Sequence, residues 1–131
     1  MTVKLENVFS PFLVSVYDAN FSTGDKVFMT AKNLCKFSKS DSSKIKQIHT
    51  YIYENIRYNN YLAQSISAGK VKSYIPNPLA ILKTGRGVCY DRASLFAAMC
   101  RSQNIPCKIV KGYNDNGLYH AWNEVYVNNK W

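Results

Sequence analysis

Apolar residues recur at helical spacing in the segment 25–37. Val27 and Ala31 stand four residues apart there, which places their side chains on one face of a helix. Residues 1–24 carry no such pattern and contain turn-forming pairs, so we expect irregular or short extended structure. We therefore predict an N-terminal extended segment, 1–24, followed by one domain, 25–131.

A second helix is predicted after the polar cluster at 38–41, which has the serine and aspartate residues typical of a helix start. Isoleucines then follow at helical spacing and line one face, with His49 at the border of that stripe. We interpret His49 as a packing or surface residue. Residues 58–80 show no convincing periodicity, which predicts a long loop. Such a loop is often functional in a compact domain, and the alternative is a disordered excursion.

A helix and two strands are predicted for the last third of the chain. Apolar residues at helical spacing follow Cys89 and stop near Asn104, which can adopt the left-handed conformation of a helix end. Alternating side chains then predict strands over 107–113 and 119–127, joined by a turn at 114–117. The expected fold class is α+β, with helices packed on a small antiparallel sheet.

Composition is consistent with a packed domain and narrows the choice of partners. Of the 131 residues, 47% are apolar, but no run approaches the length of a membrane span, and no signal-peptide pattern stands at the N-terminus. The net charge of +9 raises the question of nucleic acid. The lysines and arginines are spread singly, as on a solvated surface, so we expect no nucleic-acid partner. An anionic cell surface or wall polymer suits the charge equally well.

One of the four cysteines stands in a reactive setting. Cys35, Cys100 and Cys107 occupy apolar-patterned positions and are predicted to be core residues, and the cysteine spacing indicates no metal site. Cys89 instead follows Gly85 and a second glycine at a helix start. The free N–H groups and dipole of such a helix end favour a thiolate and can stabilise an oxyanion. The alternative for this segment alone is a buried cysteine at a glycine-rich turn.

His120 favours the catalytic interpretation of Cys89. A helix followed by two antiparallel strands returns to the start of the helix, which brings His120 near Cys89. A cysteine beside a histidine is the nucleophile and base pair of cysteine hydrolases and acyl transferases. Trp122 lies on the same face of the predicted strand as His120, and we expect it to pack beside the imidazole and exclude water.

These segments resemble the transglutaminase-like superfamily. The stretch GRGVCYDRASLFAAM at 85–99 is similar to the core motif of that family, and HAWNEVY at 120–126 is similar to its histidine motif. The similarity extends over about 25–131. The family includes animal transglutaminases, peptide N-glycanases and bacterial cell-surface cysteine proteases. The resemblance implies a papain-like fold, no cofactor, and a Cys–His–Asp triad with Cys89 as nucleophile and His120 as base.

The third member of this triad is expected beyond Trp131. In the family, an aspartate follows the histidine by about fifteen residues, on the next strand. Hairpin arithmetic at the Asn128-Asn129 pair places a residue shortly after Trp131 diagonally opposite His120. We therefore expect a domain without its last strand, a chain of weak or no activity, and an open sheet edge available for self-association. Three acids within the chain are poorly placed to take over this role: Asp91, Asp115 and Glu124.

Two further residues are candidates for the site. Tyr58 and Asn59 end the helix that precedes the predicted loop, where members of the family present a side chain to the site. We assign them as oxyanion or site-lining residues, with ordinary packing or a helix end as the alternative.

Taken together, the sequence predicts a thiol-dependent hydrolase of amide or peptide bonds, a cysteine protease, or an acyl transferase. Its substrate is expected to be a protein or peptide. The alternative is a non-catalytic binding or structural module with the same fold. The resemblance implies an extracellular or cell-surface location on a bacterium, with the cytoplasm as the alternative.

Overall fold

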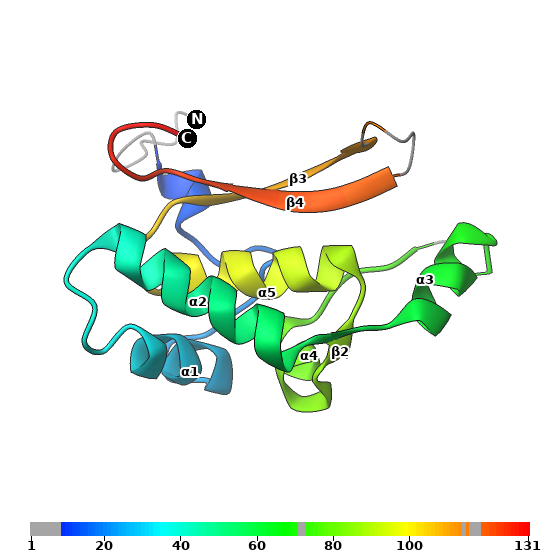
Figure 1. The fold of residues 1–131 in the computed structure, drawn as a ribbon, viewed down its shortest axis with the longest axis horizontal. Coiled ribbons are helices and arrows are strands. Elements are labelled where there is room, and N and C mark those ends of the chain that lie inside the picture. Colours follow the sequence, from blue (N-terminus) through cyan, green and yellow to red (C-terminus); the bar gives the residue numbers. More distant parts are fainter. Residues whose placement is uncertain (1–8, 71–72, 114, 116–118) are drawn as a thin grey trace, which may run out of the picture.

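The computed structural model describes residues 9–70, 73–113, 115 and 119–131. Its central element is helix α5, which lies between a hairpin of two strands and a layer of other helices (Figure 1). The elements in chain order are a 3-10 helix at Ser10–Phe12, α1 at Lys26–Leu34, α2 at Asp41–Asn55, β1 at Arg57–Tyr58, α3 at Asn60–Ser67, α4 at Pro78–Thr84, β2 at Arg86–Gly87, α5 at Cys89–Ser102, β3 at Cys107–Tyr113 and β4 at Tyr119–Val125. This mixture of helices with small sheets confirms the predicted α+β class.

Polar side chains begin α1 and α2 where the sequence predicts helix starts. The Asp25 carboxylate accepts a hydrogen bond from the Phe28 N–H at 2.8 Å. The Ser40 hydroxyl accepts one from the Ser43 N–H at 3.2 Å. Each bond satisfies an N–H group that the first turn of a helix leaves without a partner, so the chain enters both helices at a defined residue.

Helix α5 forms the centre of the core. Leu95 and Met99 have no exposed surface, and the helix packs against α1, α2, α4 and both strands of the hairpin. The polar residues that α5 buries, Asp91, Ser94 and Arg101, all have hydrogen-bond partners, as a buried helix requires. Helix α5 ends as predicted, because Asn104 takes a left-handed conformation with φ of 62°. The Ile105 N–H then donates to the Cys100 carbonyl at 2.9 Å, which closes the helix end.

Strands β3 and β4 pair in an antiparallel hairpin, and β3 has the bounds that the sequence predicts. Strand β4 is two residues shorter than predicted. The face of β4 with Ala121 packs on α5, where the Asn123 amide donates to the Ala93 carbonyl at 2.9 Å. Of the predicted turn 114–117, only Asp115 lies within the described residues.

A second turn follows β4 and has the predicted register. Val127 and Lys130 form an isolated antiparallel bridge, and Asn128 and Asn129 have φ values of 54° and 65°. Two consecutive residues with positive φ are the signature of a type I′ hairpin turn, for which asparagine is well suited. The chain therefore turns back toward β4 at this point.

The predicted loop 58–80 is wrong in two respects. Residues 60–67 form helix α3, and Pro78 already begins α4. Helix α3 has no fully buried residue and only eight residues, so its half-buried stripe of Leu62, Ala63 and Ile66 is too short to stand out in the sequence. The short parallel pair of β1 with β2 was also not predicted, since strands of two residues carry no alternating pattern.

The segment before α1 packs on α5 and the hairpin. Ala19 is completely buried in the core, and the Ser94 hydroxyl donates to the Asp18 carbonyl. The buried Arg101 guanidinium joins this segment to β3, because it donates to the Val14 carbonyl at 3.1 Å and to the Cys107 carbonyl at 2.8 Å. Within the described part of the chain, no helix is long and apolar enough to cross a membrane.

Candidate active site

Cys89 is the first residue of α5, and the residues around it hold that helix end rigidly. The buried Asp91 carboxylate accepts a hydrogen bond from the Val88 N–H at 2.8 Å, which caps the helix. A Cβ atom on Gly87 would lie 2.5 Å from the Asp91 Cβ, closer than side chains approach. Glycine at 87 is therefore needed for the capping carboxylate to fit against the chain just before the nucleophile.

The second oxygen of Asp91 has a different partner. The Tyr74 hydroxyl donates to it at 2.7 Å, which fastens the segment before α4 to the start of α5. Burial raises the pKa of the Asp91 carboxyl, and the hydrogen bonds from Tyr74 and Val88 lower it in part. Both oxygens are thus engaged in structural bonds, in agreement with the prediction that Asp91 does not orient the histidine.

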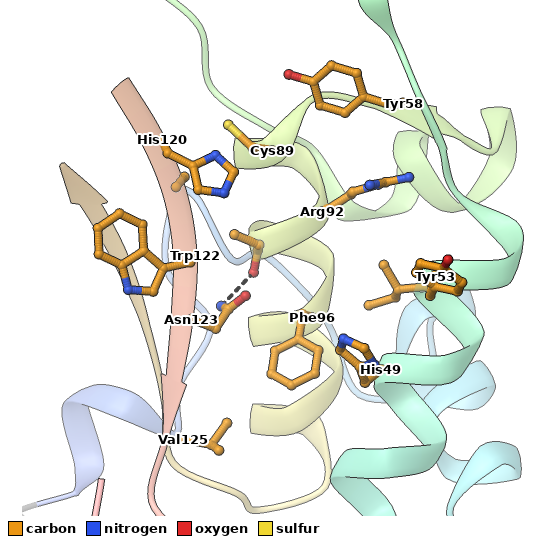
Figure 2. Close-up of a pocket in the computed structure, with 13 residues that line it drawn as sticks. His49, Tyr53, Tyr58, Cys89, Arg92, Phe96, His120, Trp122, Asn123 and Val125 are labelled. Atoms are coloured by element: carbon orange, nitrogen blue, oxygen red, sulfur yellow. Dashed lines mark hydrogen bonds between the residues drawn. The ribbon is translucent and has the colours of Figure 1, made fainter. Parts of the chain in front are cut away.

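His120 and Cys89 lie on the same cavity. Figure 2 shows the Cys89 sulfur next to the His120 imidazole, between the start of α5 and strand β4. Trp122 stacks beside that imidazole, with 6.1 Å between ring centroids and 25° between ring planes. Gly112 pairs with His120 on the neighbouring strand, and the Trp122 ring approaches to 3.4 Å from the place where a Cβ on Gly112 would stand.

Two cavities meet at Cys89. The first, of about 420 Å³, lies over α5 between α2 and β4, and it extends from Cys89 and His120 past Phe96 to Val125 (Figure 2). The second, of about 320 Å³, is bounded by residues of α3, by the segment before α4 and by β3. Tyr58, Cys89 and Ala121 line both, so a substrate carbonyl at Cys89 has space on either side.

Tyr58 is placed beside Cys89 by the pairing of β1 with β2. The Asn59 N–H donates to the Gly87 carbonyl at 2.9 Å, which fixes β1 against the loop before the nucleophile. Burial, and then the charge of Cys89, raise the pKa of Tyr58. The Asn59 side chain has another task, since its oxygen accepts from the Leu62 N–H at 3.0 Å and caps α3. Asn59 is not among the residues that line the two cavities.

The first cavity is also lined by Arg92, to which we assigned no role from the sequence, and by His49, to which we assigned a different one. The Arg92 guanidinium donates to the Ile56 carbonyl at 2.6 Å and lies 5.6 Å from the Tyr58 ring centroid. Arg92 follows Cys89 by three residues on the predicted helix, so both side chains lie on one face, and this spacing could have indicated that Arg92 is near the site. His49, which we interpreted as a packing or surface residue, is exposed and lines the cavity away from Cys89 (Figure 2).

The other three cysteines are core residues, as predicted. Cys35, Cys100 and Cys107 are buried, whereas Cys89 is half-buried, and all four thiols are free. Burial raises the pKa of Cys35 and raises that of Cys100 strongly. The described residues contain no group of three or more His, Cys, Asp and Glu side chains suited to a metal ion.

This arrangement brings a half-buried thiol, an imidazole and the free N–H groups of a helix start together. The first N–H groups of a helix have no carbonyl partner within it, so the start of α5 offers donors next to the sulfur. None of the described residues that line the two cavities is acidic, while Arg92, Lys111 and the two histidines line them. The site therefore suits attack of a thiolate on a carbonyl and stabilisation of the negative charge that develops.

Comparisons with known proteins agree with this geometry. The model of the transglutaminase-like superfamily matches residues 29–131. Kyphoscoliosis peptidase of Mus musculus is 30% identical over 110 residues, which cover 76% of this chain and 16% of that protein. The Homo sapiens Kyphoscoliosis peptidase is 26% identical over 129 residues, 90% of this chain and 19% of that protein.

A solved structure from a bacterium has the same fold. The "Putative Cysteine Protease" from Cytophaga hutchinsonii superposes with a TM-score of 0.75 at 26% sequence identity, over 97% of this chain and 41% of that one. The present chain thus spans less than half the length of each of these three proteins.

Proposed function

The chain belongs to the transglutaminase-like superfamily, and from this membership and the Cys89–His120 pair we propose a thiol-dependent hydrolase or acyl transferase acting on amide bonds. The proposed substrate is a protein or peptide. The observation that carries the proposal is the shared cavity, in which the half-buried sulfur at the start of α5 lies beside an imidazole (Figure 2). The printed name of the Cytophaga hutchinsonii protein supports the hydrolase option.

In the proposed mechanism, the His120 imidazole takes the thiol proton and the Cys89 sulfur attacks the amide carbonyl carbon. The carbonyl oxygen gains a negative charge, which the N–H groups at the start of α5 stabilise. The C–N bond then breaks, and the imidazolium gives its proton to the departing amine. Water, or an amine in the transferase case, gives a proton to the imidazole and attacks the carbonyl carbon of the resulting thioester, and the C–S bond breaks to release the thiolate.

We place the third member of the triad, an aspartate, on a strand that follows the Asn128-Asn129 turn. The type I′ geometry directs the chain back along β4 and supports this placement. An acid there would hold the imidazole of His120 in the orientation that accepts the thiol proton.

Alkylation of the native chain tests the nucleophile without a known substrate. We expect iodoacetamide at neutral pH to modify Cys89 at least about tenfold faster than Cys35 and Cys100, whose raised pKa values and burial protect them. Mass spectrometry of the digested protein gives the rate at each thiol. His120→Gln should slow modification of Cys89, and the exposed Glu124→Gln on the same strand serves as the matched control.

Two outcomes would contradict the proposal. One is modification of all four thiols at similar rates in the folded protein. The other is a Cys89 rate that does not change in His120→Gln. Either result would favour the alternative, a binding or structural module that keeps the fold without the chemistry.

A further inference from the structure

The second cavity carries a cation that the proposed chemistry does not use. We propose that Lys111 makes this cavity a site for a carboxylate of the substrate, so that amides next to an acidic residue are preferred. This inference rests on the proposed function, because it names the substrate class of the same site. The second cavity lies on the other side of Cys89 from the first cavity, which runs between α2 and β4.

Strand register directs Lys111 toward the nucleophile. Lys111 pairs with Ala121 in the hairpin, and paired residues of antiparallel strands lie on the same face. Ala121 is buried on the α5 side, so the lysine side chain extends to that side as well. Its Nζ lies 3.1 Å from the Tyr90 hydroxyl and 4.3 Å from the centroid of the Tyr90 ring. Tyr90 directly follows Cys89, so the cation is held beside the nucleophile.

The ammonium group keeps donors for a ligand. A lysine ammonium has three N–H donors, and the Tyr90 hydroxyl accepts one of them. Tyr90 gives its own proton to the Asp18 carboxylate at 2.7 Å, and the raised pKa of Tyr90 keeps this phenol neutral. Asp18 therefore reaches Lys111 only through a neutral phenol and does not form a direct ion pair with it.

The remaining walls favour an anion over a cation. Among the described residues that line the second cavity, Lys111 is the charged one and none is acidic. Tyr74 also presents a neutral phenol, whose proton goes to Asp91. Ala63, Ile66 and Val88 form apolar walls, while Lys111 itself is exposed, so its attraction for an anion is that of a charge near the protein surface.

Arg92 does not offer the same recognition in the first cavity. Its Nε and one terminal nitrogen both donate to the Ile56 carbonyl, and the guanidinium lies over the Tyr58 ring. These contacts hold two of its five N–H donors on the backbone just before β1. Lys111 has one donor in use, and no described residue that lines its cavity is acidic, so we place the substrate carboxylate on the Lys111 side of Cys89.

A pair of alkylating reagents that differ in charge tests this inference in the chain as it exists. The readout is the ratio of the Cys89 modification rates with iodoacetate, an anion, and iodoacetamide, which is neutral. We expect Lys111→Met to lower this ratio about two- to tenfold. The attraction between the lysine ammonium and the iodoacetate carboxylate, a few ångströms apart in a site open to water, corresponds to a rate change of about this size. A ratio is insensitive to changes in the thiolate itself, since these affect both reagents equally.

Lys108→Met is the matched control. Lys108 lies on the same strand but on the other face, where its Nζ is 3.8 Å from the Trp131 ring centroid. Its removal should leave the ratio unchanged. An unchanged ratio in Lys111→Met, or an equal fall in Lys108→Met, overturns the inference.

Peptide substrates separate this inference from the proposed function. Peptides with glutamate, glutamine or leucine beside the reacting amide are compared on wild type and Lys111→Met. A glutamate preference of at least about fivefold in kcat/KM that Lys111→Met removes supports the inference. Cleavage that needs Cys89 but shows no such preference overturns it and leaves the proposed function intact. If no peptide is cleaved, the reagent ratio decides the inference, and the rates at the four thiols decide the proposed function.

Discussion

Gly87 is the residue whose replacement the structure tolerates least near the nucleophile. A methyl group there would overlap the Asp91 side chain that caps α5. We expect Gly87→Ala to lower the free energy of unfolding by about 1–3 kcal/mol, the usual cost of overpacking, and to slow alkylation of Cys89. Urea denaturation and the alkylation rate measure the two effects.

Gly112→Ala is the control for that substitution. Its added methyl would lie 3.4 Å from the Trp122 ring, which is an ordinary contact. We expect its stability to stay within about 0.5 kcal/mol of wild type. Equal stability of Gly87→Ala and wild type would show that the cap is not rigid.

The Asp91 carboxyl predicts a pH dependence of stability. Burial raises its pKa above the ordinary value of 3.8, so the folded state binds this proton more tightly than the unfolded state. Ionisation therefore opposes folding, and the contribution of Asp91 to the free energy of unfolding falls as pH rises from 3.8 through the folded pKa. Above that pKa the contribution is constant.

Asp91→Asn isolates this contribution, because asparagine keeps an acceptor for the Val88 N–H. We expect wild type to lose stability relative to Asp91→Asn as pH rises from mildly acidic to neutral values. Urea denaturation of both proteins across that range measures the difference. A difference that stays constant, or that moves in favour of wild type as pH rises, would contradict the raised pKa.

The sequence predicted that Cys89 and His120 lie together, which the shared cavity confirms, but not the contacts that hold them there. Cys89 and His120 stand in local patterns, a glycine-rich helix start and a strand after a turn. The partners of the site are distant in sequence, such as Tyr74 on Asp91 and Arg92 on the Ile56 carbonyl. Those bonds depend on how separate elements pack, which no spacing along the chain expresses.

At the scale of elements, one amide connects β4 to α5 and thereby positions the histidine. The Asn123 amide donates to the Ala93 carbonyl at 2.9 Å and to the Lys108 carbonyl at 3.2 Å. We expect Asn123→Ala to reduce the free energy of unfolding by about 1–3 kcal/mol, since it removes the hydrogen bonds to the Ala93 and Lys108 carbonyls that join β4 to α5 and β3. Because β4 then lies less firmly on α5, His120 should also activate Cys89 less.

Urea denaturation and the Cys89 alkylation rate measure these two effects together. Glu124→Ala is the control on the exposed face of the same strand, and we expect it to change neither quantity appreciably. Loss of stability in Asn123→Ala with an unchanged alkylation rate would mean that this contact does not position the histidine.

Elements with a clear start signal and a buried stripe were the predictable ones. Helix α2 has both, with Ser40 as its cap and Ile48 and Ile52 buried on one face. Helix α3 has a cap at Asn59 and an apolar stripe of Leu62, Ala63 and Ile66, but it is only eight residues long and none of them is fully buried. The length of an element matters as well. Strands β1 and β2 have two residues each, which is too short to show an alternating pattern, and they are held together by their parallel pairing.

At the scale of the whole molecule, the core extends beyond the segment that helical periodicity delimits. The predicted domain starts at 25 and the family match at 29, yet Ala19 is completely buried. Residues before α1 lack any periodic pattern, because they make contact through single side chains and backbone carbonyls. Their place in the core could therefore not be predicted from the sequence.

Removal of residues 1–24 should consequently destabilise the chain. It would leave the Tyr90 and Ser94 hydroxyls and one nitrogen of Arg101 without their partners in the N-terminal segment. Each of these hydrogen bonds contributes about 1 kcal/mol, and the burial of Ala19 in the core is lost as well, so we expect a loss of at least about 3 kcal/mol in the free energy of unfolding. Urea denaturation of the 25–131 chain beside the full chain measures this loss. Ser94→Ala, which loses one of these bonds, should lose only about 1 kcal/mol.

Because Tyr90 directly follows Cys89, Cys89 should also be alkylated more slowly in the shortened chain. A 25–131 chain as stable as the full one, with an unchanged Cys89 rate, would mean that the contacts of the N-terminal segment contribute nothing to the core or the site.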